Sequence, residues 1–463
     1  MNKLKDIKIC LWTVALLSAL ILCVPCKAQS GKYKADTLLY SGKSSTVADI
    51  VFLGEGYTQN EMNKFVKDVK ELSTYFFNKE PWKHYSDMFN VFYVKTPSNV
   101  SGAGMTPDKP IDNFYKVTFG YAGVDRMPWP SDGMAKVYEV LKSAKPDYDM
   151  VIILVNSTKY GGAGGGKFMC VSLDYWSKET ICHEAGHAFA DLADEYWYER
   201  YTEHANDTYT KDPVKWARWV DPNGKGPEHI GVYEFEDTVK NWFRPHERCL
   251  MRYLAEDYCA VCREAIVEKI HSTGRLLKSY SPKNTVKNNI AEGPATYTIE
   301  TVKVTPNTLR REWTLNGQTI AMNTDELVLT PEMMTEAYST LKVTIEDTTT
   351  MVRVENHSKI HMTSVQWTVK YDEAAGISTV ESDADEFIVG PIPLADELTF
   401  SSHRKLSDKV SIALYDINGS LVVEGSFNPD EYCSVPVAGL SPGVYMVTVY
   451  IGDRLVYSAK VIK

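Results

Sequence analysis

The sequence has no surplus of basic residues. Its 463 residues include 50 Lys and Arg against 60 Asp and Glu, a formal net charge of -10. A surface that binds nucleic acid needs positive charge to neutralise phosphates, so this balance argues against a nucleic-acid binder. Hydrophobic residues make up 44% and charged residues 24%, which is ordinary for a folded protein, and the length allows two or three domains.

Outside the N-terminus the sequence also lacks an apolar run long enough to cross a membrane, so we expect no transmembrane segment in the mature chain. Residues 1–28 have the features of a secretory signal peptide, with basic MNKLKDIK, apolar CLWTVALLSALILCV and a small residue before Gln29. The alternatives are a membrane anchor, for which the run is short, and lipidation at Cys23 or Cys26, which do not follow the usual small residue. We expect a secreted, extracellular or cell-surface protein, with the periplasm as the other destination.

In the mature chain cysteine is scarce, and a second CxxC pair is missing. Nine cysteines become six after removal of the signal peptide, and only Cys259 and Cys262 form a CxxC. A zinc knuckle usually requires two such pairs, so the pattern favours a disulfide from Cys249 to one of these two residues. Buried reduced thiols are the other interpretation.

A phosphate-binding loop is incomplete as well. GGAGGGK at 161–167 fits GxxxxGK, but Phe168 stands where Ser or Thr is needed, which excludes nucleotide binding. We interpret the glycines as a flexible rim before the strand FMCVSL. An extended peptide can add to the edge of such a strand through backbone hydrogen bonds.

Two kinds of pattern divide the chain. Buried strands such as DIVFLGEGY, FNVFYVKT and DMVIILVN alternate with helical segments, one of them beginning at a capping box of Thr58 and Glu61, and this predicts an α/β domain over 29–280. Short alternating strands then predict two small all-β sandwich domains, 281–375 and 376–463, the last with a hairpin around Asn418 and Gly419.

The segment HEAGHAFADLADEY, residues 183–196, contains the pattern HExxH. On the helix predicted over 178–193, His183 and His187 are four residues apart and share a face, so both can bind one zinc ion. Glu184 can point at the open coordination position and act as general base and then general acid. The sequence therefore predicts one catalytic zinc ion in a peptide-hydrolysing site.

The usual third ligand is missing, because Ala190 and Ala193 stand where HExxHxxGxxH has glycine and histidine. Asp194 can bind the ion only if the helix ends near Asp191 or Leu192 and the chain bends back, since two further helical turns would carry it about 10 Å away. We favour Asp194 as the third ligand. The alternatives are Glu195, which more readily anchors the bend by pairing with a cation, and Glu199, Glu203, His204, His229 and His246.

The stretch CLMRY, 249–253, supports a bend of this kind. It is similar to a tight turn in which Met251 packs beneath the metal, and Tyr253 could then stabilise the oxyanion of the reaction. The other interpretation makes Met251 an ordinary core residue and Tyr253 a surface ring. The aromatic run YWYERY, 196–201, either packs in the core or lines the cleft.

Several separate motifs carry a family resemblance: HEAGHAFADLADEY, CLMRY with CAVC, VFLGEGYTQNEMNKF, NKEPW, FNVFYV and YGGAGGG. Together, from about Lys32 to His271, they resemble the bacterial IgA peptidase family of zinc metallopeptidases. The resemblance implies a metzincin-like α/β (α+β) fold and one catalytic zinc. It also implies the usual roles for His183, Glu184 and His187, with the acid of the DEY segment as the missing ligand.

The last block, from about residue 385, resembles the C-terminal sorting domains of cargo for the type nine secretion system. GPIPLADELTF, VSIALYDINGSLV and SPGVYMVTV carry this likeness. A carbohydrate- or protein-binding accessory domain is the alternative.

We therefore expect a secreted zinc endopeptidase. Its substrate is expected to be a protein or peptide, host glycoproteins included. The alternative is a catalytically silent surface protein that binds glycan or host protein through its β domains, although the intact Glu184 argues against it. Hydrolysis of a non-peptide amide uses the same chemistry.

Overall fold

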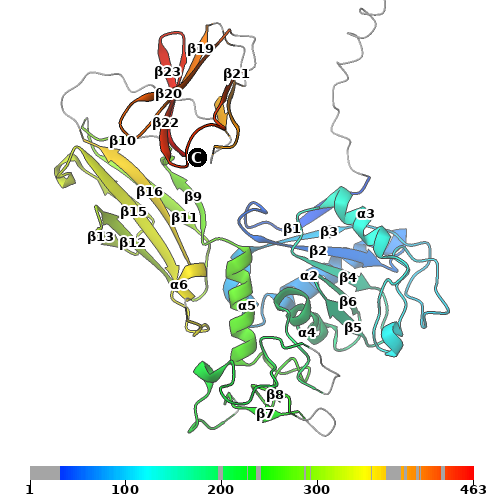
Figure 1. The fold of residues 1–463 in the computed structure, drawn as a ribbon. Helices are drawn as coiled ribbons and strands as arrows, with labels where there is room; N and C mark the ends of the chain where they lie inside the picture. Colours follow the sequence, from blue (N-terminus) through cyan, green and yellow to red (C-terminus); the bar gives the residue numbers. More distant parts are fainter. Residues whose placement is uncertain are drawn as a thin grey trace, which may run out of the picture. The chain divides into compact units, whose positions relative to one another are not determined.

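The structure is a computed structural model (Figure 1). It describes residues 32–196, 202–226, 228–235, 241–285, 288–291, 293–355, 357–371, 387–390, 394–402, 406, 408–428 and 433–463. The expected signal peptide and Glu199 lie outside these residues.

Contacts divide the chain into two compact units. Unit 1 draws on Met1–Lys278, Thr301–Arg310 and Glu346–Thr363, and unit 2 draws on Ser279–Glu300, Arg311–Ile345 and Ser364–Lys463. The three-domain division expected from the sequence, with boundaries near 280 and 375, stays a prediction.

Unit 1 is built on a six-stranded sheet with the strand order β1-β3-β2-β4-β6-β5. The strands are β1 Ala35–Leu39, β2 Ala48–Glu55, β3 Phe89–Val94, β4 Met150–Val155, β5 Gly162–Gly165 and β6 Phe168–Ser172. The inner strands β3, β2, β4 and β6 run parallel, whereas β1 and β5 pair antiparallel at the two edges. Every residue of β2 and β4 is buried, as expected where helices cover both faces of a parallel sheet.

Helices cover this sheet on its two faces (Figure 1). Val137, Val140 and Leu141 of α3 (Met134–Ala144) share a core with Val51 and Leu53 of β2. On the other face lie α2 (Met62–Phe76) and α4 (Ser177–Ala190), and α4 also packs against α5 (Ala260–Thr273). The smaller elements are η1 Gln59–Glu61, η2 Trp82–Met88, η3 Tyr121–Gly123, η4 Ala217–Trp219, α6 His357–Ile360, β7 Tyr233–Glu234 and β8 Phe243–Arg244.

The edge of the sheet differs from the prediction. FMCVSL does not form an edge, because β6 pairs with β4 on one side and with β5 on the other. The glycine-rich segment expected as a flexible rim is itself the outer strand, β5. Residues 162 and 164 of this strand face α4 so closely that an added Cβ would lie 2.5 and 2.8 Å from the Glu184 carboxylate. Glycine is therefore needed for packing, and its low strand propensity hid the strand.

Unit 2 contains paired sheets. The first pair has the orders β10-β16-β15-β12-β13 and β14-β11-β9, and ring contacts from Trp367 of β16 to Tyr297 of β11 and to Trp313 of β12 lie in its core. Its elements are β9 Leu277–Ser281, β10 Asn288–Asn289, β11 Ala295–Thr301, β12 Leu309–Leu315, β13 Gln318–Met322, β14 Glu326–Leu329, η5 Pro331–Met333, β15 Tyr338–Asp347 and β16 Met362–Lys370.

The second pair has the orders β17-β18-β21 and β20-β19-β22-β23, and residues of both sheets, such as Phe400 and Val447, share one hydrophobic core. Its strands are β17 Phe387–Gly390, β18 Glu397–Ser402, β19 Val410–Tyr415, β20 Leu421–Phe427, β21 Cys433–Pro436, β22 Val444–Ile451 and β23 Arg454–Ile462. The hairpin predicted around Asn418 and Gly419 is confirmed as β19–β20. The mixed α/β part followed by β-sheets agrees with the coarse fold class expected from the sequence.

Candidate metal centre

The HExxH segment lies on α4, which ends earlier than the helix predicted over 178–193. Its last residue is Ala190, and Asp191 takes a left-handed conformation with φ 51°. The Asp191 amide donates to His187 O at 3.2 Å and the Leu192 amide donates to Gly186 O at 3.0 Å, so both amides cap carbonyls at the end of the helix. Aspartate tolerates this conformation better than most residues, and the chain turns back immediately after the helix.

This bend brings Asp194 to the two histidines. Asp194 Oδ1 lies 3.1 Å from His183 Nε2 and 3.2 Å from His187 Nε2, and the two Nε2 atoms are 3.3 Å apart. The ligand atoms of a four-coordinate zinc ion, with bonds of about 2.0–2.2 Å, lie roughly 3.3–3.6 Å from one another. The three side chains therefore fit a single small divalent cation, and one of them, His183, lines a cavity.

Backbone carbonyls orient both imidazoles. His183 Nδ1 lies 2.9 Å from Leu250 O, and His187 Nδ1 lies 2.6 Å from Leu192 O. A carbonyl can only accept, so each Nδ1 carries the proton and donates it. Each Nε2 is then left with a lone pair directed at the shared point, the arrangement that metal-binding histidines require.

The charges at this point are mutually stabilising. Burial raises the pKa of Asp194, but His187 and His183 outweigh it and hold the pKa well below its ordinary value. Burial lowers the pKa of His187, yet Asp194 outweighs it and raises the pKa to about 9. The carboxylate that favours a proton on His187 favours a cation between the same atoms equally well.

Glu184 lines a cavity of about 300 Å³ together with His183, Arg126, Tyr160 and Tyr196. Its side chain is largely buried between α4 and β5, and burial raises its carboxyl pKa above the ordinary value, with His183 and His187 opposing the shift. A carboxylate with a raised pKa beside the two histidines suits a group that accepts a proton and releases it again.

The turn CLMRY runs beneath α4. The amides of Arg252 and Tyr253 both donate to Cys249 O, at 2.8 and 2.9 Å, so the turn is tight. Met251 is fully buried, and a Cβ added at Gly186 would lie 2.6 Å from its sulfur. Tyr253 lines the cavity and is 46% exposed.

Other carboxylates weighed as third ligands have different partners. Glu195 is fully buried but faces Asn206 and Cys262, whose thiol lies 3.3 Å from Oε1. Among the described residues, no cation of the kind expected to pair with it forms an ion pair with Glu195. Burial raises the pKa of Glu195 well above its ordinary value. Glu203 accepts from the Tyr209 amide at 2.9 Å and pairs with Lys215 at 3.1 Å.

The other histidines likewise have different partners. His204 Nδ1 lies 3.6 Å from Asp207, His229 Nδ1 lies 3.0 Å from the Tyr233 hydroxyl, and His246 Nδ1 lies 2.7 Å from Arg248 O. None of these three belongs to the group formed by His183, His187 and Asp194.

Three residues around the site, Arg126, Tyr160 and Asn206, escaped sequence reasoning. Arg126 and Tyr160 line the cavity from loops that carry no motif. Tyr196, the first residue of the aromatic run, also lines it, with its hydroxyl 3.4 Å from Arg126. Asn206 holds the ligand-bearing loop by donating to Ala193 O and accepting from the Ala193 amide, both at 2.8 Å. A hydrogen-bonding role of this kind leaves no sequence signal.

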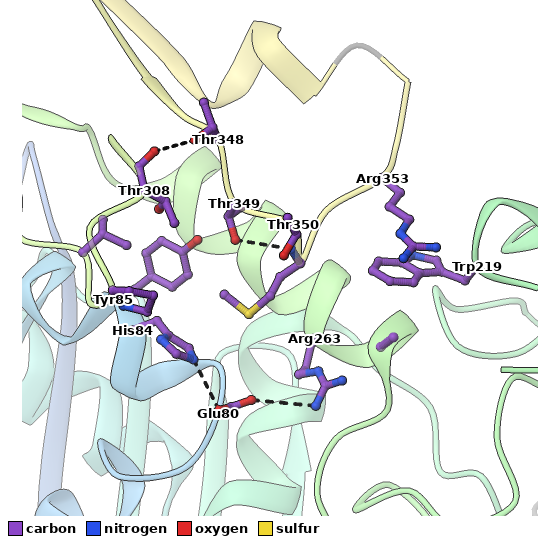
Figure 2. A pocket seen from close by; sticks show the side chains of 14 residues that line it. Glu80, His84, Tyr85, Trp219, Arg263, Thr308, Thr348, Thr349, Thr350 and Arg353 are labelled. Atoms are coloured by element: carbon purple, nitrogen blue, oxygen red, sulfur yellow. Dashed lines mark hydrogen bonds and ion pairs between the residues drawn. The ribbon is translucent and has the colours of Figure 1, made fainter. Parts of the chain in front are cut away.

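A larger cavity of about 480 Å³ in unit 1 shares no lining residue with the first. Figure 2 shows Glu80 between His84 and Arg263, at 3.5 and 3.8 Å, with Thr348, Thr349 and Thr350 opposite. It is therefore separate from the metal centre.

A buried contact between a histidine and an aspartate lies near this second cavity. Asp347 accepts from Tyr85 at 2.8 Å, pairs with His271 at 3.0 Å and also accepts from Thr308, so the carboxylate has its partners within the protein. We read this group as a structural network.

The geometry of this site is compatible with a metal-dependent peptidase, and comparison with known families points to the same class of protein. Residues 37–223 match the family described as IgA Peptidase M64, and this stretch contains His183, Glu184, His187 and Asp194 but stops before Met251. Residues 389–463 match the family described as Secretion system C-terminal sorting domain. The protein is thus a secreted or cell-surface protein whose N-terminal part matches a peptidase family, and the substrate that such a family implies is a protein or peptide.

Among the described residues, no helix is long and apolar enough to span a membrane. No curated protein matches the sequence.

Similar solved structures share little with the chain. A mixed-linkage glucan utilization locus protein, SGBP-B, of Bacteroides ovatus is 16% identical over 39% of this chain and 43% of its own, with a TM-score of 0.15. Fibronectin(III)-like modules of Clostridium thermocellum CbhA are 12% identical over 39% and 90%, with 0.16, and Bacteroides uniformis β-glucuronidase 3 is 7% identical over 51% and 30%, with 0.20. Scores this low do not establish a common fold. The chain also spans less than half of the first of these proteins.

Proposed function

We propose that the protein is a secreted zinc-dependent endopeptidase with one catalytic zinc ion held by His183, His187 and Asp194. The observation that carries this proposal is the spacing of 3.1–3.3 Å among His183 Nε2, His187 Nε2 and Asp194 Oδ1. The bend after α4 and the buried Met251 beneath it support a metzincin-like arrangement with a Met-turn.

When bound, zinc supplies a Lewis acid that polarises a carbonyl group and makes water acidic enough to attack near neutral pH. Glu184 takes a proton from the attacking water and gives it to the leaving amine. Leu250 O and Leu192 O keep the two imidazoles in the tautomer that leaves Nε2 free. Tyr253 donates its hydroxyl proton toward the oxygen that gains negative charge.

The sheet edge offers a place for the substrate. Strand β5 pairs only with β6 in the described sheet, and its residues 162 and 164 lie against Glu184. A peptide that adds to β5 as a further strand is held by backbone hydrogen bonds, which are largely independent of sequence. Its scissile bond then passes beside Glu184 and the histidines.

The test is mass-spectrometric detection of cleavage products after incubation of the mature protein with casein and with immunoglobulin A, a host glycoprotein. We expect peptide fragments from the wild type and none from Glu184→Ala. Asp194→Ala should lose the catalytic zinc, whereas Glu184→Ala should retain it. Equal zinc content in wild type and Asp194→Ala contradicts the ligand assignment, and zinc binding without cleavage of any protein favours the silent surface protein.

A further inference from the structure

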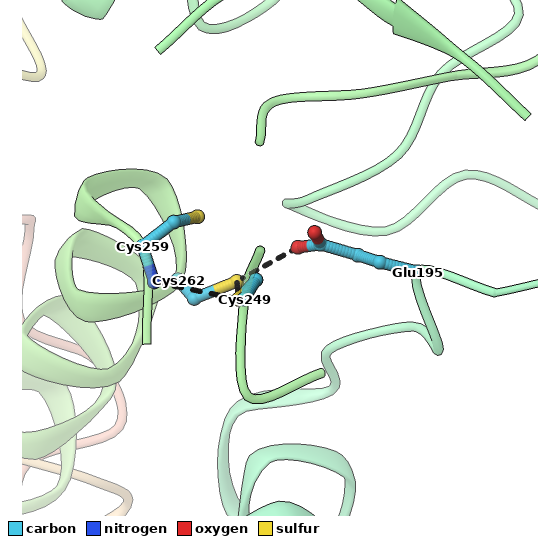
Figure 3. Close-up of side chains that lie close together, drawn as sticks. All are labelled: Glu195, Cys249, Cys259 and Cys262. Atoms are coloured by element: carbon cyan, nitrogen blue, oxygen red, sulfur yellow. Dashed lines mark hydrogen bonds between the residues drawn. The ribbon is translucent and has the colours of Figure 1, made fainter. Parts of the chain in front are cut away.

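Four side chains with metal-binding chemistry meet in unit 1 behind the ligand loop (Figure 3). Glu195 follows Asp194 directly, Cys249 begins the turn that contains Met251, and Cys259 and Cys262 lie at the N-terminal end of α5. All four are buried, with at most 3% of any residue exposed, and their ligand atoms lie within 4.8 Å of one another.

The spacing of these atoms suits a tetrahedral zinc ion. Cys249 Sγ and Cys262 Sγ are 3.7 Å apart, and Cys262 Sγ is 3.3 Å from Glu195 Oε1. With Zn–S bonds of about 2.3 Å and Zn–O bonds of about 2.0–2.2 Å, a tetrahedron places two sulfurs roughly 3.8 Å apart and a sulfur and an oxygen roughly 3.6 Å apart.

The same spacing does not suit the disulfide expected from the sequence. A disulfide requires about 2.05 Å between its sulfurs, and all six described cysteines are free. Any single disulfide among Cys249, Cys259 and Cys262 also leaves one thiol over. Such a disulfide also provides no partner for the Glu195 carboxylate, which points into the group.

Glu195 itself indicates a missing cation. Oε1 accepts from Asn206 Nδ2 at 3.0 Å, but Oε2 is buried without a hydrogen-bond partner. Among the residues that the structure describes, no Lys, Arg or His forms an ion pair with it. A buried carboxylate with an unsatisfied oxygen is costly, and native proteins rarely keep one without an ion, a water or a charged partner.

We propose that Cys249, Cys259, Cys262 and Glu195 bind a second zinc ion, as a closed structural site distinct from the catalytic one. Four protein ligands leave no open position for water or substrate, which is the property of structural zinc sites. Thiolates suit zinc because they are soft ligands, and the carboxylate completes the coordination.

Such a site ties together the segments that build the catalytic centre. The Glu195 amide donates to Met251 O at 2.8 Å, and Leu250, next to Cys249, orients His183. A metal bond at Glu195 fixes the loop at the residue beside Asp194, and a metal bond at Cys249 fixes the turn. The second zinc therefore acts on catalysis only by positioning.

The experiment measures zinc per chain in the whole mature protein by elemental analysis. The protein is first incubated with Zn²⁺ in excess and is then dialysed against buffer without Zn²⁺. We expect two zinc ions in the wild type and in Cys170→Ser, a buried cysteine of β6 outside the group. Cys262→Ser and Glu195→Gln should each hold one.

The double variant His183→Ala/His187→Ala leaves the cysteine group intact. It therefore tests the second zinc site even where the cysteine variants fail to fold. It should retain one zinc ion whose X-ray absorption spectrum shows a sulfur-rich shell at about 2.3 Å. This readout does not use activity, so a failed peptidase assay and a failed structural site are distinguishable.

Three results overturn the proposal. One is a double-histidine variant without zinc. Another is a zinc shell of nitrogen and oxygen only. The third is a disulfide-linked peptide, found by mass spectrometry of a wild-type digest, that joins two of Cys249, Cys259 and Cys262.

Discussion

Asp194 and Glu195 are neighbours in the sequence, yet they belong to two different groups. Asp194 joins two histidines at a cavity, with 20% of its side chain exposed, whereas Glu195 joins three thiols and is fully buried. One residue of the first group, His183, lines a cavity, whereas all four residues of the second group are buried. The difference separates a centre suited to chemistry from one suited to holding the fold.

The largest expected effect comes from changing these neighbours one at a time. Asp194→Asn should lower peptidase activity at least about a thousandfold, because a lost Lewis acid removes several kcal/mol of transition-state stabilisation. Glu195→Gln should cost at most roughly 10–100-fold, as residues that only position a ligand do. Rates on one peptide substrate check this, and equal losses for both variants contradict the division of roles.

Met251 packs against α4 at Gly186 and its carbonyl accepts from the Glu195 amide, so its truncation should weaken both groups. Met251→Ala removes a fully buried side chain and is expected to lower the free energy of unfolding by about 2–5 kcal/mol. Met105→Ala, at a site 52% exposed, serves as the control and should change stability by less than about 0.5 kcal/mol. Denaturant unfolding measures both; a small effect at Met251 argues that the turn is loosely packed.

Changes in strand β5 should affect only the group of His183, His187 and Asp194 and the neighbouring Glu184. In Gly162→Ala the new Cβ would lie 2.5 Å from Glu184 Oε1, so the carboxylate must move, and displacement of a catalytic group by about 1 Å costs on the order of 10²-fold. Gly165→Ala meets no atom within 4 Å and should retain wild-type activity. Measurement of kcat for both variants tests this prediction, and zinc content should be unchanged in both. Equal kcat values for the two variants contradict it.

Tyr253 should give the smallest effect. The residue is 46% exposed, so a hydrogen bond from its hydroxyl is worth about 1 kcal/mol, and Tyr253→Phe should lower kcat roughly fivefold with little change in KM. Tyr196→Phe is the matched comparison on the same cavity. A larger loss in the Tyr196 variant transfers the oxyanion role to that residue.

Sequence reasoning reached the coarse fold because burial patterns are local. The strands DIVFLGEGY and DMVIILVN and the Asn418–Gly419 hairpin correspond to β2, β4 and β19–β20. Strand β5 was missed because its glycines are selected by the approach of α4, a tertiary cause that opposes strand propensity.

At the site, the sequence indicated which bend of the chain would be required but not how it is held. The condition that the helix end near Asp191 agrees with the observed end at Ala190, and the cap depends on one residue with positive φ. Asn206, Arg126 and the meeting of Glu195 with the cysteines depend on segments that are distant in sequence. The single CxxC of the mature chain therefore contained too little information to identify Glu195 as a neighbour of these cysteines.

The turn at 249–253 also bears on where the chain can be cut. All three proposed catalytic ligands precede residue 196, but Leu250 O orients His183 and Met251 O holds Glu195 from more than fifty residues later. A fragment that ends with the family match at residue 223 keeps every ligand and loses both supports. The shortest fragment that we expect to keep both proposed metal sites therefore extends at least through Cys262, whereas none of these groups draws on the sorting domain at 389–463.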